Sequence, residues 1–320
     1  MARNDQPGGD QASSLTVARD QAGLRLDVFI RERFPGCGRS RARALLRQGA
    51  VLLNDRRATA GQRLEAGDRV NFRRAPEQTA FEPQVNPAFE LELLFEDAHL
   101  VAVNKPPHLP SHPLRSDERD TVVNFLLARF PEMLDVGYRP REGGLVHRLD
   151  GGTSGLMLAA RTRPAFEALR LQLRSSELDK RYLALCAGEL SAPIELRHRL
   201  LVAHRRKVVV QKRCSSGGVW VRSWILRRSL FDSRTALGPL SLLWLKAPRA
   251  VRHQLRAQLA AIGHPIVGDR LYQGPELAPL DRHFLHASEI RFRHPVSARP
   301  LRLRAPLSDD LRSCLAGIAP

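Results

Sequence analysis

The feature that most constrains the fold of this chain is a proline-rich segment, residues 75–88, that interrupts its apolar pattern. The segment reads APEQTAFEPQVNPA, with three prolines and little apolar periodicity, which is typical of a linker between domains. It leaves a short part before it and residues 89–320 after it. At about 150 residues per domain, 320 residues fit two domains, so we predict the domain boundary within this segment.

The part before the linker predicts a small α/β module of two short helices and a few short strands. Apolar residues recur at helical spacing in two stretches, 26–30 and 42–46. Short strands with turns between them are predicted within 51–72. We assign residues 21–74 to this module. We expect residues 1–20, which are polar and contain no long apolar run, to be a disordered N-terminus.

The net charge of the chain indicates what kind of partner it binds. Lys and Arg number 51 against 33 Asp and Glu, a net charge of +18, which favours a polyanion such as nucleic acid. In the module, Arg39, Arg43 and Arg47 recur every four residues without interleaved carboxylates, and Arg56 and Arg57 follow a turn. Like charges at that spacing repel by a few tenths of a kcal/mol per pair. We therefore interpret the stripe as a phosphate-binding surface; the alternative is a solvated helix face.

Several other classes of protein are disfavoured. The longest unbroken apolar run is Tyr182 to Ala187, far short of the roughly 20 residues of a membrane helix, and no secretory signal precedes the module. The four cysteines form no Cys-x-x-Cys pair. His108 and His112 are four residues apart, but the prolines around them exclude a helix that would place both on one face. We expect a cytoplasmic protein without disulfides, bound metal or membrane association.

Residues 89–320 alternate predicted strands with predicted helices. The strands are predicted at 89–95, 100–104, 156–160, 181–186, 208–211, 219–227 and 240–245. The helices are predicted at 121–130, 164–173 and 251–262. This order favours an α+β domain with a mixed, mostly antiparallel sheet.

A glycine-rich turn carries the first candidate for chemistry. The segment GGLVHRLDGGTSGLMLAAR, residues 143–161, places Asp150 directly before Gly151 and Gly152. These glycines let the backbone bend and leave space beside the carboxylate. No Gly-Lys-Ser/Thr follows, which excludes a P-loop. An ordinary Asp-Gly turn is the alternative interpretation.

Two further segments carry candidate side chains. Tyr182 lies inside the predicted strand of LDKRYLALCAGEL, where a half-buried structural tyrosine is the alternative. The third segment, VRHQLRAQLAAIGHPIVGDRLYQG, begins with a predicted helix on which Arg252 and Arg256 share one face. The alternative there is a solvated basic end of a helix.

Taken together, the three segments resemble the RluA-type pseudouridine synthases over essentially residue 90 to the C-terminus. His147-Arg148-Leu149-Asp150 with Thr153-Ser154-Gly155 is similar to the signature around the family's catalytic aspartate. Tyr182 falls on the active-site tyrosine, and Arg256 on the arginine of the motif His253-Gln254-Leu255-Arg256. Two further stretches match, GHPIVGDRLY from Gly263 and NKPPHLPSHP from Asn104.

The N-terminal module resembles the small RNA-binding module named after a ribosomal small-subunit protein, the S-four module. The matching stretches are Leu26-Asp27, SRARALLRQGAVLLND from Ser40 and LEAGDRV from Leu64. An S-four module before the catalytic domain is a known arrangement within the family. The resemblance implies that RNA is the partner.

The resemblance implies a pseudouridine synthase fold for residues 89–320 and a cofactor-free isomerisation. Uracil is detached from C1′ of ribose, rotated and rejoined through carbon, with Asp150 as nucleophile or as the group that assists uracil departure. Arg256 would pair with Asp150, and Tyr182 would stack on uracil and help remove the C5 proton. Arg148 and Arg252 would contact RNA. We expect a monomer acting on structured RNA, with large-subunit ribosomal RNA favoured and transfer RNA the alternative.

Two places depart from the family pattern. The usual Gly-Arg two places before His-Gln is Ala250-Val251, so that Arg252 is the candidate replacement. The strand that normally reads Lys-x-Ala-x-Thr is Val219-Trp220-Val221-Arg222-Ser223 and lacks the lysine. These departures keep open a noncatalytic RNA-binding or ribosome-assembly protein on the same scaffold. A hydrolase that cleaves the same bond is a third reading, but most such enzymes need two carboxylates.

Overall fold

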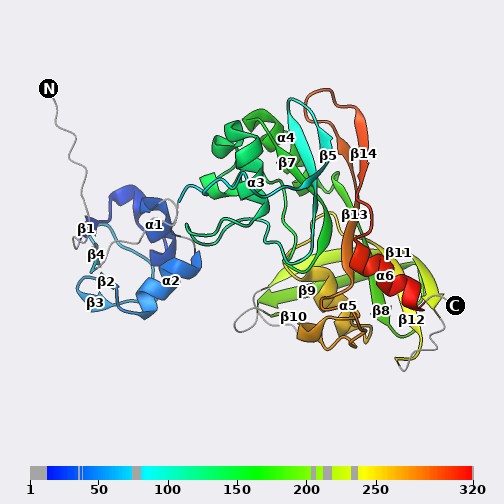
Figure 1. Ribbon diagram of the computed structural model, residues 1–320. Helices are drawn as coiled ribbons and strands as arrows, with labels where there is room; N and C mark the ends of the chain where they lie inside the picture. Colours follow the sequence, from blue (N-terminus) through cyan, green and yellow to red (C-terminus); the bar gives the residue numbers. More distant parts are fainter. Residues whose placement is uncertain are drawn as a thin grey trace. The chain divides into compact units, whose positions relative to one another are not determined.

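The structure is a computed structural model that describes residues 13–34, 37, 39–73, 81–202, 207–211, 218–231 and 237–318. The chain divides into two compact units, Met1–Phe81 and Glu82–Pro320 (Figure 1). The division falls inside residues 75–88, the segment predicted as a linker.

The N-terminal unit packs two helices against a four-stranded sheet. The helices are α1 (Leu26–Arg33) and α2 (Arg39–Arg47), preceded by a short 3-10 helix, η1 (Arg19–Gln21). The sheet order is β1-β4-β2-β3, with bounds β1 (Ser13–Thr16), β2 (Val51–Leu53), β3 (Arg56–Arg57) and β4 (Arg69–Phe72). Both helices are stabilised by packing, because their apolar residues share one core with the sheet. This core is centred on Phe29, Ile30, Leu45 and Phe72.

One expectation for this unit is wrong. Residues 1–20 were predicted to be disordered, but Ser13–Thr16 pairs antiparallel with β4. The reason is a short apolar alternation: Val17 is buried and Leu15 packs against the same core. Residues 1–12 lie outside the described part of the chain.

The C-terminal unit is built on one large mixed sheet. Its strand order is β10-β9-β11-β12-β8-β13-β7-β6-β5, and β14 pairs with β13. The first strands along the chain are β5 (Glu92–Glu96), β6 (Leu100–Lys105), β7 (Ser154–Ala160), β8 (Asp179–Ala187) and β9 (Ile194–Val202). The others are β10 (Val208–Val210), β11 (Val219–Phe231), β12 (Leu240–Lys246), β13 (Leu285–Arg293) and β14 (Pro300–Arg304). The pairing of β13 with β7 is parallel and the other pairings described are antiparallel, which confirms the predicted fold class.

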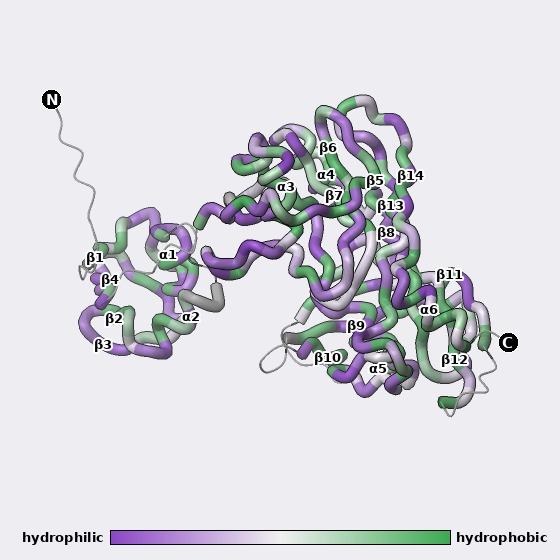
Figure 2. Tube along the Cα trace, in the orientation of Figure 1, coloured by the Kyte–Doolittle hydropathy of each residue, from purple (hydrophilic) through white to green (hydrophobic). Residues whose placement is uncertain are grey.

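Within the described residues of this unit, four helices and three 3-10 turns accompany the sheet. The helices are α3 (Val122–Arg129), α4 (Arg163–Ser175), α5 (Gln254–Ala261) and α6 (Asp309–Ile318). The 3-10 turns are η2 (Pro131–Asp135), η3 (Pro140–Glu142) and η5 (Arg270–Tyr272). Figure 2 shows hydrophobic stretches along the strands and helices of both units. Strand β7 is buried along its whole length, as its continuous apolar run predicts.

The third predicted helix is shorter than expected. We predicted a helix over 251–262, but α5 begins at Gln254 because His253 has a left-handed backbone, with φ at 55°. Arg252 therefore lies outside the helix and is exposed, whereas Arg256 is buried. The prediction that these two arginines share one helix face is wrong.

The described residues bear on the expectations about cysteines and membrane helices. Cys37, Cys186 and Cys314 are buried, the last two as free thiols, and Cys214 lies outside the described residues. None of the helices in the described ranges is both long and apolar enough to cross a membrane.

Candidate active site

A pocket in the C-terminal unit brings together the three residues predicted to be catalytic. Asp150 comes from the turn before β7, Tyr182 from β8 and Arg256 from α5, although these segments lie far apart in the sequence. The remaining lining residues are Arg148, Leu149, Thr153, Ala250, Val251, Arg252, His253, Gln254, Leu255 and Leu285. The pocket therefore joins all three sequence segments that were singled out for their chemistry.

Arg256 connects two carboxylates. Its Nη1 donates a hydrogen bond to Oδ2 of Asp150 at 3.3 Å, so the predicted ion pair is present. Its Nε and Nη2 donate to the two oxygens of Asp269, at 2.6 and 2.8 Å. Burial by itself would lower the pKa of Arg256, but the hydrogen bonds and charge of Asp269, and then the charge of Asp150, raise it. Arg256 is therefore a fixed cation beside Asp150.

His253 lies near the same carboxylate oxygen of Asp150. Its Nε2 is 3.7 Å from Oδ2 of Asp150, and its Nδ1 is 3.1 Å from the hydroxyl of Tyr272. That hydroxyl already donates to the carbonyl of Val208 at 2.9 Å, so Nδ1–H is the donor toward Tyr272. Burial lowers the pKa of His253, although the charge of Asp150 opposes the shift. Burial therefore favours the neutral form of the imidazole beside Asp150.

Tyr182 closes the pocket from β8. Its backbone position is fixed between Leu245 of β12 and Ala287 of β13, and the residue is only 4% exposed. Burial, and then the negative charge of Asp150, raise the pKa of Tyr182. The phenol therefore keeps its proton at neutral pH and presents a ring face with a hydrogen-bond donor.

The turn after Asp150 is held on one side by Lys105, at the end of β6. Lys105 is fully buried, and its Nζ donates to the carbonyl of Gly151 at 3.0 Å and to those of Pro106 and Leu109. Burial, and then the charge of Arg282, lower the pKa of Lys105 to about 7. Ser111 adds a further tie, because its hydroxyl donates to the carbonyl of Leu149 at 2.8 Å and accepts from its amide at 3.1 Å.

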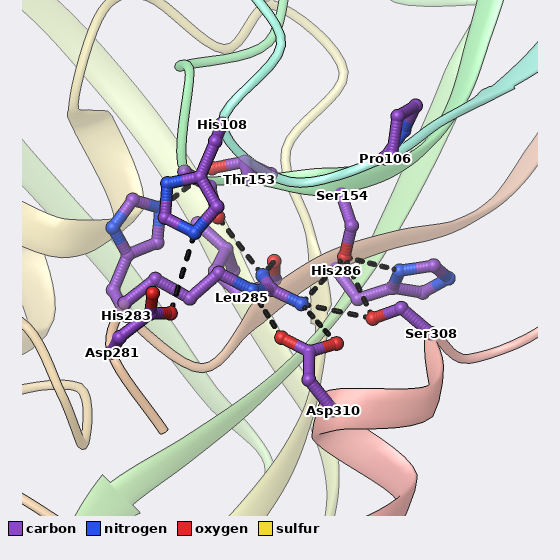
Figure 3. Close-up of polar contacts among 12 residues, drawn as sticks. Pro106, His108, Thr153, Ser154, Asp281, His283, Leu285, His286, Ser308 and Asp310 are labelled. Carbon is purple, nitrogen blue, oxygen red and sulfur yellow. Dashed lines mark hydrogen bonds and ion pairs between the residues drawn. The ribbon is translucent and has the colours of Figure 1, made fainter. Parts of the chain in front are cut away.

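The same turn is held on the other side by the segment before β13 (Figure 3). Arg282 Nη1 donates to the carbonyl of Gly152 at 2.9 Å, while its Nε and Nη2 bind Asp310 at the start of α6 at 2.6 and 3.0 Å. His283 lies 2.8 Å from the hydroxyl of Thr153. Burial lowers the pKa of His283 well below its usual range, so the ring is neutral. A Cβ at position 152 would lie 2.9 Å from that ring, which explains the glycine there.

Two further predicted RNA-binding residues lie at this pocket. Arg148 and Arg252 line it and are exposed, so their charged ends reach the solvent beside Asp150. Ala250 and Val251, the first departure from the family pattern, also line the pocket. The structure thus places Arg252 close to where the usual arginine is missing.

In the N-terminal unit, only some of the arginines that were predicted to bind phosphate lie close together. Arg43, Arg47 and Arg57 line one pocket with Leu46 and residues 58–60, and Arg56 is exposed on β3. Arg39 is the first residue of α2, but its side chain is not among those that the structure describes.

The interpretation of the stripe as free of carboxylates needs a correction. Nε of Arg43 lies 3.3 Å from Oδ2 of the buried Asp27 of α1, which also binds Arg25. The carboxylate comes from the neighbouring helix, and the pattern of one helix cannot reveal it. Arg47 and Arg57 are the better candidates for phosphate contacts.

Four residues of this arrangement were not predicted from the sequence. Asp269, Lys105, Arg282 and His283 hold Arg256 or the Asp150 turn through long-range contacts. Asp269 lies in the stretch GHPIVGDRLY and Lys105 in NKPPHLPSHP, so two of them fall in segments that the sequence did single out. Within the described ranges, no group of three or more His, Cys, Asp or Glu side chains could hold a metal ion.

Comparison with known proteins agrees with this geometry. A family model described as RNA pseudouridylate synthase matches residues 99–261, and a model of the S4 domain matches residues 24–70. The chain is 35% identical to ribosomal large subunit pseudouridine synthase D of Xylella fastidiosa, covering 95% of this chain and 91% of the relative. For the protein of the same name from Xanthomonas campestris the identity is 33%, with 99% and 95% covered.

Solved structures support the fold. Human RNA Pseudouridylate Synthase Domain Containing 4 aligns with a TM-score of 0.53 and 21% identity, covering 71% of this chain and 92% of that one. Human RNA Pseudouridylate Synthase Domain Containing 1 aligns with a TM-score of 0.52 and 23% identity, covering 70% and 87%. At these identities the likeness concerns the fold.

Proposed function

Because this chain belongs to the RNA pseudouridylate synthase family, we propose that it isomerises uridines of large-subunit ribosomal RNA with Asp150 as nucleophile. The enzyme is an RNA pseudouridine synthase, an isomerase. The observation that carries the assignment of Asp150 is its ion pair with Arg256 in a pocket that also contains Tyr182. The ribosomal substrate is supported by the names of the relatives.

The chemistry balances without a cofactor. The bond between N1 and C1′ breaks, a bond between C5 and C1′ forms, the proton leaves C5 and N1 gains a proton. Asp150 either attacks C1′ or assists uracil departure, and in both cases it must be ionised. The nearby cation Arg256 favours that ionised form, and the ties of Lys105 and Arg282 to the turn fix its direction.

Tyr182 suits a stacking role on the uracil ring. Because burial and the charge of Asp150 raise the pKa of Tyr182, the phenol is a hydrogen-bond donor before the reaction starts. If Asp150 bonds to C1′, its negative charge is consumed, and this contribution to the raised pKa disappears. Tyr182 is then better able to help remove the C5 proton.

The target uridine must leave its stack to reach this pocket, which costs a few kcal/mol. Phosphate contacts offset such a cost. Arg148 and Arg252 are exposed at the pocket, and the N-terminal S4 domain supplies a second RNA-binding surface. We assign both to phosphate contacts that position the RNA rather than read its bases.

The quaternary state and compartment follow from the same proposal. Asp150, Tyr182 and Arg256 already meet in one pocket of this chain, so the proposed reaction needs no residue from a second copy, and we propose a monomer. We also propose a cytoplasmic location, the compartment expected for an enzyme that acts on ribosomal RNA. Sedimentation of the full chain at micromolar concentration, with and without RNA, tests the monomer.

Tritium release from RNA that contains [5-³H]uridine tests the function. We expect release from large-subunit ribosomal RNA, and the modified positions can be mapped in the product. Release from transfer RNA alone would contradict the ribosomal substrate. Free uracil in place of pseudouridine would indicate a hydrolase, and RNA binding without release would indicate the noncatalytic alternative.

A further inference from the structure

Strand β11 carries two tryptophans on the face of the sheet opposite α5. Trp220 and Trp224 alternate with the buried residues Val221 and Ser223, so the tryptophans point to one side and the buried residues to the other. Ser223 faces α5, because its hydroxyl donates to Gln258 at 2.7 Å. Trp220 is 61% exposed, so its ring is accessible to a ligand.

Cationic side chains surround both rings. The guanidinium carbon of Arg197, on β9, lies 5.3 Å from the ring centroid of Trp220. Arg222 lies 5.7 Å from the ring of Trp224, and Nζ of Lys246, on β12, lies 5.8 Å from it. These distances are those of cation–π contacts. The antiparallel register explains the grouping, since Arg222 is opposite Arg197 and Trp224 is opposite Lys246.

The tryptophans line a hollow that adjoins the active site. Its lining includes Trp220, Arg222, Trp224, Pro248 and the exposed Arg249. Val251 lines both this hollow and the pocket of Asp150. An RNA strand that leaves the active site over residues 248–251 therefore enters the hollow directly.

We propose that this hollow binds an unpaired RNA segment beside the target uridine, with one base stacked on Trp220. The inference rests on the proposed function for the identity of the RNA. Stacking on an exposed aromatic ring, next to cations that track phosphates, is the usual way in which single strands are bound. Arg197, Arg222, Arg249 and Lys246 bring four positive charges to the hollow. Two carboxylates lie against them, Glu195 beside Arg222 and Asp179 at 3.6 Å from Lys246, so positive charge remains in excess. That balance fits a polyanion better than the charge-depleted centre of a protein interface.

This surface lies where the sequence differs from the family pattern. Residues 219–223 are the second place where the sequence departs from the family pattern, and there the usual lysine is absent. In this chain the strand presents Trp220 and Arg222 instead. A base-stacking contact of this kind contributes to affinity without reading one particular base.

The direct test compares Trp220→Ala with Trp220→Phe in the full-length chain. The probes are a single-stranded oligoribonucleotide and a duplex of equal length. Trp220→Ala should weaken single-strand binding at least about 5-fold and leave duplex binding unchanged. Trp220→Phe keeps a stacking ring and should stay within about 2-fold. Tyr138→Ala, at another exposed aromatic residue, is the matched control and should bind like the wild type.

Turnover and sedimentation of the same variants complete the test. Trp220→Ala should raise KM for tritium release and leave kcat within about 2-fold, because the contact is remote from the reacting atoms. Unchanged single-strand binding and KM would overturn the inference, as would a loss of self-association in place of RNA binding. If Trp220→Ala destabilises the chain, the double variant Arg197→Ala, Arg249→Ala tests the surface through a shallower salt dependence, and an unchanged slope would refute the proposal.

This design separates the two proposals. Failure of the wild type to release tritium, together with weakened single-strand binding by Trp220→Ala, would reject the proposed function and retain the surface. Normal turnover with unchanged binding would reject the surface and retain the function.

Discussion

Arg256 is bound more closely by Asp269 than by Asp150. It donates two hydrogen bonds to Asp269, at 2.6 and 2.8 Å, and one to Asp150, at 3.3 Å. Asp269 is 1% exposed and does not line the pocket, whereas the side chain of Asp150 is 17% exposed. The bidentate contact therefore fixes the guanidinium plane, and the remaining Nη1 is directed at the carboxylate that faces the pocket. Asp269 is thus a positioning residue for the ion pair.

We expect Asp269→Asn to lower kcat for tritium release at least about tenfold and to leave KM nearly unchanged. The amide loses the charge that holds Arg256, and breaking a buried pair also costs up to about 3–5 kcal/mol of folding stability. Single-turnover rates at saturating RNA and urea unfolding measure the two effects. Asp281→Asn is the control, because that carboxylate is 76% exposed. Unchanged turnover in Asp269→Asn would show that Arg256 needs no such support.

Replacement of Tyr182 separates its ring from its hydroxyl. Tyr182→Phe keeps the stacking face and should reduce kcat more than it reduces RNA affinity, whereas Tyr182→Ala should weaken both. The measurements are single-turnover tritium release and a binding titration with the same RNA. If Tyr182→Phe turns over like the wild type, the hydroxyl has no part in the reaction and stacking alone remains.

The N-terminal unit should contribute phosphate contacts through Arg47 and Arg57, which line one pocket. Arg43 is left in place because it binds the buried Asp27. The double variant Arg47→Ala, Arg57→Ala should make the slope of log K against log salt shallower by about 1.4–1.8 units, if each residue contacts one phosphate. Turnover at saturating RNA should change little.

A charge-matched control comes from the same unit. Arg31→Ala with Arg33→Ala removes two exposed charges from α1 and should leave the slope closer to that of the wild type. If both double variants alter the slope equally, binding depends on net charge rather than on the pocket of Arg47 and Arg57.

The lowered pKa of Glu289 makes the stability of the fold depend on pH in the acid range. Burial by itself would raise the pKa of Glu289, but hydrogen bonds from Arg302, Arg304 and Arg291 lower it to about 2, from 4.5. Because the folded-state pKa is the lower one, this carboxylate stabilises the fold above about pH 4.5. That contribution is lost as the pH falls toward 2.

Glu289→Gln should therefore lower the free energy of unfolding at pH 7, by at most about 3 kcal/mol. The difference from the wild type should shrink between pH 4.5 and 3. Urea unfolding at several pH values provides the measurement. Glu276→Gln is the control, because Glu276 and its partner Arg270 are 68% and 73% exposed, and such pairs contribute about 0–1 kcal/mol. Equal effects of the two variants at pH 7 would contradict the role of Glu289.

The sequence was informative where a residue and its role lie in one short segment. Asp150 is marked by Gly151 and Gly152 beside it, and the catalytic candidates Tyr182 and Arg256 each lie inside a recognisable motif. The apolar run of β7 also predicts its burial. In these cases the local pattern already contains the physical reason for the structure.

The rest depends on contacts between distant residues. The tie of Arg282 to Gly152 and the tie of Asp269 to Arg256 appear only when the chain is folded. Strand β13 was missed because charged residues interrupt its apolar pattern, and Glu289 within it is stabilised by arginines of β14. The start of α5 was misplaced because the left-handed backbone of His253 has no mark in the sequence.

The central claim is that Asp150 is the reacting carboxylate, and Asp150→Asn tests it most directly. The amide keeps the shape of the side chain but cannot act as a nucleophile. The measurement is tritium release from [5-³H]uridine in large-subunit ribosomal RNA under single-turnover conditions, with RNA affinity determined in parallel. We expect no release above the rate without enzyme, and affinity within about threefold of the wild type. Release at a rate near that of the wild type would contradict the assignment of Asp150.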